Sequence, residues 1–332
     1  MDVVFSGMRP TGRLHLGHMA GALTNWLQLQ NDHECYYSLV DWHALMSDYA
    51  DPGKLSENTR EILLDWLAVG LDPEKCAIFV QSHVRGHIEL HLALSLITPL
   101  GWLERNPTYK DQILNLQNKD LSTYGFLGYP VLMASDILLY KASKVPVGED
   151  QSAHLELSRE IARRFNHLYG EGREIFPEPE TILTRYPKIP GTDGRKMSKS
   201  YGNTLDIADE ISVLDKKIRT MMTDPARERR TDPGEPDKCP VWDLHKFFNN
   251  DDSQMSEIPV GCRTAGIGCI DCKKMLIAHV TRHMTPIHER RLRFSSRDDE
   301  LKDIMRAGAN RARTRSERTM DEVRDALHML KL

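Results

Sequence analysis

The first half of the chain alternates short β-rich runs with helical patterns, and this alternation limits the possible folds more than any other feature of the sequence. Strands that are joined through helices in this way run parallel and pair in one sheet. The strand candidates lie at 3–5, 36–40, 77–80 and 145–147, and the helical patterns lie at about 16–27, 54–70, 130–140 and 153–165. We therefore expect an α/β fold with a doubly wound parallel sheet.

The second half has a different pattern. Beyond about Tyr201 the sequence predicts helices, which are separated by a Pro-rich connector between Pro225 and Pro240. A chain of 332 residues usually divides into about two domains of roughly 150 residues each. We therefore predict an α/β domain over 1–200 and a smaller all-α domain over 201–332.

The composition is that of an ordinary globular chain, with 40% hydrophobic and 28% charged residues and no low-complexity tract. No run approaches the about 20 apolar residues that are needed to cross a bilayer, and the N-terminus does not resemble a secretory signal. We expect a cytoplasmic protein with no membrane segment. In that reducing compartment, six cysteines are expected to be buried, metal-bound or catalytic rather than paired in disulfides.

Charge is distributed unevenly along the chain. The formal net charge is −4, yet the segment from Lys273 to the end carries 15 Lys and Arg against 9 Asp and Glu. Its arginines include Arg282, Arg290, Arg291, Arg293, Arg306, Arg311, Arg313, Arg315 and Arg318. A single arginine usually belongs to a solvated helix face, but the group predicts a surface for a nucleic-acid backbone.

A first motif stands between the first strand and the first helix, where the chain reads Gly-Met-Arg-Pro-Thr-Gly-Arg-Leu-His-Leu-Gly-His over 7–18. In a doubly wound sheet, ligands bind at the carboxyl ends of the strands, where helix N-termini offer free N–H groups to phosphate. His15 and His18 project from one side of the first turn, and Gly17 permits close approach of a base. The motif is neither a Walker loop nor a GxGxxG turn. Alone, the motif favours two histidines that merely cap a helix over a phosphate site.

A second motif follows at 194–200, where a Gly- and Pro-containing loop reads Gly-Arg-Lys-Met-Ser-Lys-Ser. Two lysines on such a loop can follow the charge that builds on a departing pyrophosphate. Together, His-Leu-Gly-His and Lys-Met-Ser-Lys-Ser resemble the two signatures of class I aminoacyl-tRNA synthetases. Four segments, at 5–12, 40–44, 129–140 and 145–151, further resemble the tryptophanyl-tRNA synthetases over nearly the whole chain.

This resemblance implies a Rossmann-type catalytic domain with the lysine loop at its end, followed by a helical anticodon-binding domain, in a homodimer. It implies that the chain activates L-tryptophan with ATP and Mg²⁺ and then loads it onto tRNA(Trp), which releases AMP and pyrophosphate. The implied catalytic residues are His15 and His18, which stabilise the phosphate in the transition state, and Lys196 and Lys199, which stabilise the departing pyrophosphate.

The resemblance also implies two sets of binding residues. ATP is expected to contact Arg9, Gly17, His18, Gly21, Gly148, Asp150, Lys196, Met197, Ser198 and Lys199. Asp150 is expected at the ribose hydroxyls, although Asp at a helix start is also an ordinary N-cap. Arg9 and His18 depart from the family pattern, since other bacterial members carry glutamine and asparagine there.

Tryptophan is expected to contact Phe5, Gly7, His43, Tyr129, Met133, Asp136, Val145, Val147 and Gln151. By resemblance, the Asp136 carboxylate accepts the indole N–H, and Tyr129 and Gln151 bind the ammonium and carboxylate groups. A buried acceptor with one N–H partner rejects substrates that lack the donor by roughly 10⁴-fold. The alternative is that Asp136 lies on an exposed helix surface. Its apolar neighbours Ile137 and Leu138 make a buried position at least as compatible with the sequence.

The remaining motif is a group of four cysteines, Cys239, Cys262, Cys269 and Cys272, spaced C-x22-C-x6-C-x2-C. Four thiolates in a reducing compartment are a metal-site pattern, and spacing alone favours zinc. The spacing also resembles the [4Fe-4S] motif of a subset of tryptophanyl-tRNA synthetases, so that an iron–sulfur cluster is the prediction and Zn²⁺ the alternative. Its expected role is structural.

Three other functions fit parts of this pattern. A tyrosyl-tRNA synthetase shares the fold and both signatures and differs in the amino-acid pocket. A small-molecule adenylyltransferase also uses an H-x-G-H helix, and a non-catalytic metal-binding regulator could retain the fold. The first differs in amino-acid preference, the second predicts no tRNA charging, and the third predicts no adenylate formation.

Overall fold

The computed structural model describes the whole chain except residues 107–108, 110–120, 149–150, 184–188 and 331–332. Its centre is a five-stranded parallel sheet in the order β3-β2-β1-β4-β5. The strands are β1 (Val3–Met8), β2 (Glu34–Leu39), β3 (Cys76–Val80), β4 (Lys144–Val147) and β5 (Glu180–Leu183). The predicted α/β fold is confirmed.

Strand order explains where a ligand can bind. The chain moves outward from β1 through β2 to β3 on one side, and then crosses to β4 and β5 on the other. Such a reversal leaves a crevice beyond the carboxyl ends of the two strands at the switch point, which here are β1 and β4. The motif-bearing segments 7–18 and 145–151 begin within these two strands and continue past their carboxyl ends.

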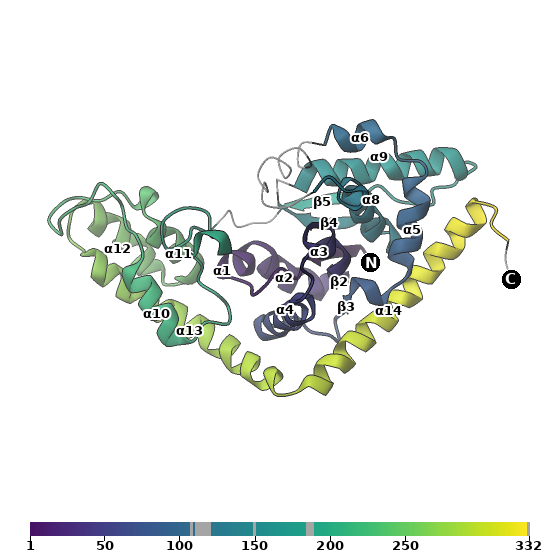
Figure 1. Ribbon diagram of the computed structural model, residues 1–332. Helices are drawn as coiled ribbons and strands as arrows, with labels where there is room; N and C mark the ends of the chain where they lie inside the picture. The colour runs from purple at the N-terminus through teal and green to yellow at the C-terminus, as the bar shows by residue number, and fades with distance from the viewer. Residues whose placement is uncertain (107–108, 110–120, 149–150, 184–188, 331–332) are drawn as a thin grey trace.

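Helices cover both faces of the sheet (Figure 1). In the first half they are α1 (Leu16–His18), the π-helix η1 (Met19–Leu23), α2 (Thr24–Asp32), α3 (Asp41–Asp48), α4 (Leu55–Val69), α5 (Gly86–Ser95), α6 (Leu100–Glu104), α8 (Tyr124–Leu139) and α9 (Ser152–Tyr169). One buried apolar cluster includes Leu63 and Leu67 of α4 with Leu276 of α13 (Cys269–Ser295), and the other includes Leu138 of α8 with Ile161 of α9. The sheet thus separates two cores.

Beyond residue 200 the described chain is helical, as predicted. Its α-helices are α10 (Ile211–Thr220), α11 (Pro240–Phe248), α12 (Asp252–Arg263), α13 (Cys269–Ser295) and α14 (Asp298–Ala326). Short 3₁₀ turns lie at η2 (Gln81–His83), η4 (Lys199–Tyr201) and η5 (Pro236–Lys238). Across the described residues, no helix is both long and apolar enough to span a bilayer.

The last helix returns to the first domain. Figure 1 shows α13 running from the helical part toward the sheet and α14 turning back along β3. Gly308 makes this packing possible, because a Cβ there would overlap the backbone carbonyl of Ile78. The division at residue 200 remains a prediction, and α14 is the part of the second segment that packs against the first.

Gly308→Ala is expected to lower the free energy of unfolding by about 1–3 kcal/mol, because the added methyl group overpacks the contact between α14 and β3. Gly125→Ala in α8 is the matched control, since no atom lies within 4 Å of the added Cβ. The midpoints of thermal unfolding of the two variants check this. Equal midpoints would show that α14 can move away from β3 without cost.

Candidate active site

Two cavities adjoin at the carboxyl ends of β1 and β4. The inner cavity, of about 400 Å³, lies between β1, β4, α3 and α8. The outer cleft, of about 990 Å³, lies between the loop after β1, α3, the start of α4 and residues 196–201. Arg9, Thr11 and His18 line both of them. A molecule in the inner cavity would therefore meet one in the outer cleft at these three side chains.

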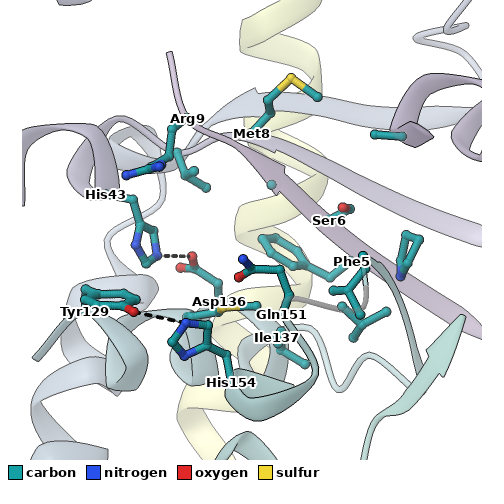
Figure 2. Close-up of a pocket in the computed structure, with 18 of the residues that line it drawn as sticks. Phe5, Ser6, Met8, Arg9, His43, Tyr129, Asp136, Ile137, Gln151 and His154 are labelled. Atoms are coloured by element: carbon teal, nitrogen blue, oxygen red, sulfur yellow. Dashed lines mark hydrogen bonds and ion pairs between the residues drawn. The ribbon is translucent and has the colours of Figure 1, made fainter. Parts of the chain in front are cut away.

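Asp136 of α8 lies on the floor of the inner cavity and is 2% exposed (Figure 2). Gln81 Nε2 donates to its two carboxylate oxygens at 2.7 and 2.9 Å. His87 Nδ1 lies 2.7 Å from Oδ1, and His43 Nε2 lies 3.0 Å from Oδ2. A carboxylate only accepts hydrogen bonds, so each of these imidazole nitrogens is the donor.

These donors decide the protonation state of Asp136. Burial acts to raise its pKa, but the electrostatic interaction with His87 and the hydrogen bonds from His43 and His87 outweigh burial and lower the pKa to about 2. The group is therefore a carboxylate at neutral pH. A buried, ionised acceptor at the floor of a cavity is suited to a ligand that presents an N–H or O–H group.

The structure gathers all nine residues predicted for the amino-acid pocket around the inner cavity. These are Phe5, Gly7, His43, Tyr129, Met133, Asp136, Val145, Val147 and Gln151. Gly7 is needed for space, since a Cβ there would lie 2.7 Å from Cγ1 of Val40. The cavity thus combines apolar walls with few polar groups, the usual make-up of a small-molecule site.

Several polar groups at this site were not foreseen from the sequence. Gln81 and His87 hold Asp136, and His154 of α9 lies 3.0 Å from the Tyr129 hydroxyl through its Nε2 atom (Figure 2). Burial raises the pKa of Tyr129, so its hydroxyl is neutral. Gln81 directly follows the buried strand β3, and its position at the carboxyl edge of the sheet was the available signal.

In the outer cleft, His15 and His18 lie with their ring centroids 3.8 Å apart. Burial lowers the pKa of His15 to about 4 and that of His18 to about 3, and Lys196 and Lys199 add to both effects. Both rings are therefore neutral at physiological pH, so each offers one N–H donor and carries no positive charge. A Cβ at residue 17 would lie 2.9 Å from His15 Nδ1, which explains the glycine there.

Backbone hydrogen bonds bring the two motifs together. Leu16 N donates to Leu205 O at 2.8 Å, and Ile207 N donates to Leu14 O at 2.9 Å. From the lysine loop, Lys199 Nζ reaches Thr11 O at 3.3 Å. Burial lowers the pKa of Lys199. A cationic loop thus stands over the helix start that carries both histidines.

The other residues predicted for ATP are distributed as follows. Seven line the outer cleft, namely Arg9, Gly17, His18, Lys196, Met197, Ser198 and Lys199. Gly148 lines the inner cavity, and Gly21 lines neither of the two. Asp150 is outside the described residues, so its predicted contact with the ribose has no structural counterpart here.

The four spaced cysteines, Cys239, Cys262, Cys269 and Cys272, line one small cavity of the helical part. Burial raises the pKa of Cys272 to about 12, and the three neighbouring thiols add a smaller effect in the same direction. Within the described ranges, however, no group of three or more His, Cys, Asp or Glu side chains is arranged so that it could hold a metal ion. The predicted metal centre is therefore not supported by the side-chain geometry.

Known proteins resemble this chain over its full length. The family model of class I tRNA synthetases (W and Y) matches residues 2–285. The tryptophan–tRNA ligase of Thermotoga maritima is 52% identical over 98% of this chain and 99% of its own length, and that of Aquifex aeolicus is 42% identical over 98% and 99%. The tryptophanyl-tRNA synthetase of Campylobacter jejuni, solved with ADP and tryptophan, has a TM-score of 0.87 at 33% identity and covers 98% of this chain and 100% of that one. The fold, the paired motifs and these matches together show that the chain belongs to the class I tRNA synthetases of the tryptophan and tyrosine family.

Proposed function

We propose that this chain is a tryptophan–tRNA ligase, which joins L-tryptophan to AMP at the expense of ATP and then transfers it to tRNA(Trp). Relatives of that activity match nearly the whole chain at 42–52% identity. The observation within the molecule that supports it best is the buried carboxylate of Asp136 beneath an apolar cavity that opens toward the outer cleft. An adenylyltransferase of small molecules and a non-catalytic regulator do not fit these relatives.

In this proposal the indole ring lies in the inner cavity and its N–H donates to Asp136. His43 and Gln81 already donate to the Oδ2 atom, at 3.0 and 2.9 Å, so one of them must share or yield that oxygen when the substrate enters. An amino acid without a ring donor, such as phenylalanine, would gain no hydrogen bond from this carboxylate and would place an apolar ring against a buried charge. Selectivity against such substrates thus follows from the pocket itself.

The reaction needs no nucleophile from the protein, because the carboxylate of tryptophan attacks the α-phosphorus of ATP. Arg9 and His18 line both cavities, so we assign them to the point where the two substrates meet. The neutral His15 and His18 rings donate hydrogen bonds to the phosphate in the transition state. Lys196 and Lys199 oppose the charge on the departing pyrophosphate, while Mg²⁺ enters with ATP as part of the substrate.

Several expectations remain predictions. They are the ribose contact of Asp150, the ATP contacts of Gly21 and Gly148, the homodimer, the anticodon-binding role of the helical segment and the cytoplasmic location. The tRNA-binding role of the arginine-rich surface is also a prediction. Two of its arginines bind groups within the chain. Arg313 Nε donates to His83 O at 2.9 Å, and Arg315 Nη1 pairs with Glu34 at 3.1 Å.

A [4Fe-4S] cluster at the four cysteines also remains a proposal. Its support is that the thiols share one cavity and that Arg227, 3.8 Å from Cys262 Sγ, could offset part of the cluster's negative charge. The cysteines come from the start of α11, from α12 and from the first turn of α13. A bound cluster would supply a covalent link among these three helices, and zinc is the alternative.

The amino acid is tested by pyrophosphate exchange with tryptophan and with tyrosine in turn, followed by charging of tRNA(Trp). We expect exchange and charging with tryptophan. Exchange with tyrosine but not with tryptophan would contradict the proposed pocket and favour a tyrosyl-tRNA synthetase.

Lys199→Ala is expected to slow adenylate formation about 100-fold or more, with little change in the Kd of tryptophan, because its interaction strengthens as charge develops on the phosphates. Rapid-quench kinetics and equilibrium dialysis measure the two quantities. Arg195→Ala on the same loop is the control, since Arg195 pairs with Asp193 at 2.6 Å. Equal losses in rate and in tryptophan binding would argue against this role of Lys199.

Asp136→Asn is expected to lower kcat/KM for tryptophan about 10- to 100-fold, because a neutral amide replaces a charged acceptor of the indole N–H. The KM for ATP should stay unchanged, since Asp136 does not line the outer cleft. Pyrophosphate-exchange kinetics with each substrate varied give both constants. An unchanged kcat/KM for tryptophan would remove Asp136 from the recognition of indole.

Protein purified without oxygen is expected to be brown and to contain about four iron and four sulfide per chain, as the proposed cluster requires. Cys262→Ser should lose this colour, whereas Cys35→Ala, at a buried thiol of β2, should keep it. Elemental analysis and absorption spectra provide the readout. Colourless protein with stoichiometric zinc would contradict the cluster and show that the four cysteines bind zinc.

A further inference from the structure

We propose that Asp65 of α4 and Arg291 of α13 are positioning residues for adenylate formation, because their buried ion pair fixes the loop that presents His15 and His18. Arg291 Nε donates to Asp65 Oδ1 at 2.7 Å. Neither residue lines the inner cavity or the outer cleft. The inference rests on the phosphate-binding role proposed above for the two histidines.

Asp65 acts on that loop directly. Its side chain is fully buried, and its second oxygen, Oδ2, accepts a hydrogen bond from Leu14 N at 3.1 Å. The carbonyl of Leu14 in turn accepts from Ile207 N. Leu14 is thus held on one side by α4 and on the other by the segment after the lysine loop. Because His15 is the next residue, the direction of its ring depends on this double attachment.

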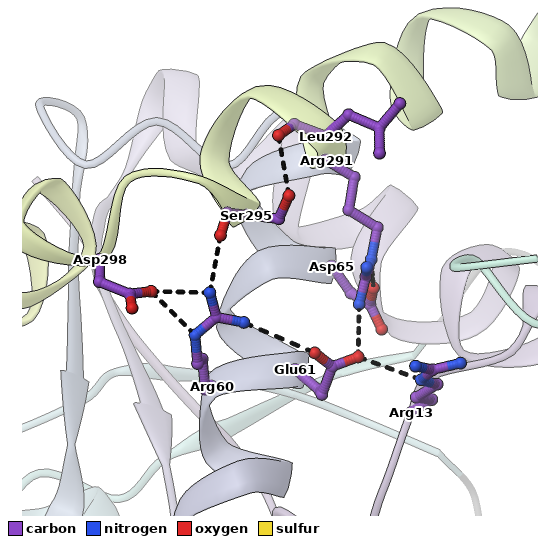
Figure 3. Close-up of polar contacts among 8 residues, drawn as sticks. All are labelled: Arg13, Arg60, Glu61, Asp65, Arg291, Leu292, Ser295 and Asp298. Atoms are coloured by element: carbon purple, nitrogen blue, oxygen red, sulfur yellow. Dashed lines mark hydrogen bonds and ion pairs between the residues drawn. The ribbon is translucent and has the colours of Figure 1, made fainter.

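A second carboxylate extends the same arrangement, as Figure 3 shows. Glu61, one turn before Asp65 on α4, accepts from Arg291 Nη2 at 2.7 Å and from Arg13 Nε at 3.0 Å through one oxygen, Oε2. Arg13 directly precedes Leu14. Two consecutive residues of the loop are therefore attached to α4 carboxylates, and both carboxylates bind the same guanidinium group.

The charge of Arg291 keeps this acceptor effective. Burial raises the pKa of Asp65 to about 6 even though Arg291 acts to lower it. Without the guanidinium group, a buried carboxylate would favour its protonated form and would bind the Leu14 N–H more weakly. Asp65 therefore depends on Arg291 to remain ionised, and the loop depends on Asp65.

This link reaches a distant part of the chain through one helix. Helix α13 is continuous from Cys269 and Cys272 in its first turn to Arg291 near its end. A shift of the C-terminal part of α13 would move Arg291 relative to α4, and the same helix, which contains Pro286 between the two sites, begins at the cysteine cavity. Arg60 of α4 makes different contacts: it donates to Ser295 O of α13 and to Asp298 of α14. It approaches Glu61 only at Oε1, at 3.7 Å, and not at the Oε2 atom that binds Arg291 and Arg13.

The test compares Arg291→Met, Arg291→Lys, Asp65→Asn and the double variant Asp65→Asn/Arg291→Met with Arg60→Met. We expect Arg291→Met and Asp65→Asn to slow adenylate formation about 10- to 100-fold, since small misplacements of catalytic groups have effects of this size. The Kd of tryptophan should change less than twofold. Arg60→Met should keep the wild-type rate, and Arg291→Lys should recover part of it.

The double variant separates positioning from a general loss of stability. The double variant lacks both charges and so contains no unpaired buried ion. It should therefore fold at least as well as Arg291→Met, as judged by thermal unfolding. If Arg291 acts through Asp65, the double variant should also lose no more rate than the slower single variant. Multiplied losses would show that the two residues act separately and would overturn the proposal.

His18→Ala, measured beside these variants, distinguishes the two levels of inference. If His18→Ala slows adenylate formation while folded Arg291→Met and Asp65→Asn keep the wild-type rate, positioning by the ion pair is wrong and the proposed active site stands. If His18→Ala itself keeps the wild-type rate, the phosphate-binding role fails and the inference that rests on it fails too.

Discussion

Two backbone hydrogen bonds, Leu16 N to Leu205 O and Ile207 N to Leu14 O, join the loop after β1 to the segment after the lysine loop. They bring together motifs that lie far apart in sequence and create the cleft in which neutral histidines face cationic lysines. Because these bonds join main-chain atoms, they fix the path of the backbone and do not depend on the identity of the side chains. The outer cleft lies beside this junction, and the α4 carboxylate of Asp65 binds Leu14 within it.

The inner cavity and the α4 site both bury a carboxylate, and they balance its charge differently. Asp136 is surrounded by Gln81, His43 and His87, and its pKa falls to about 2, so its charge is available to a ligand. Asp65 has one strong partner in Arg291, and its pKa rises to about 6. Two imidazoles lower the pKa of Asp136, whereas the neighbouring carboxylate of Glu61 adds to the effect of burial at Asp65. One carboxylate is suited to recognition and the other to holding a loop.

Much of the fold could be predicted because β-branched and aromatic runs such as 77–80 alternate with amphipathic helices. Strand β5 was not predicted, since Glu180–Leu183 is short and begins with two polar residues. Adjacent motifs identified the residues of both cavities, but Gln81, His87 and His154 carry no motif and act through partners distant in sequence. The cysteine spacing predicted a metal centre that the side-chain geometry does not reproduce.

The sequence alone determined the βαβ order, the paired motifs and the residue types of the amino-acid pocket, because periodicity and short motifs are local properties. Only the tertiary structure decided that α14 lies along β3, that His15 and His18 are neutral, and that Arg291 reaches Asp65. Each of these depends on burial and on contacts between segments that are far apart in the chain. Desolvation and charge pairing act through space, so they exist only once the helices have packed.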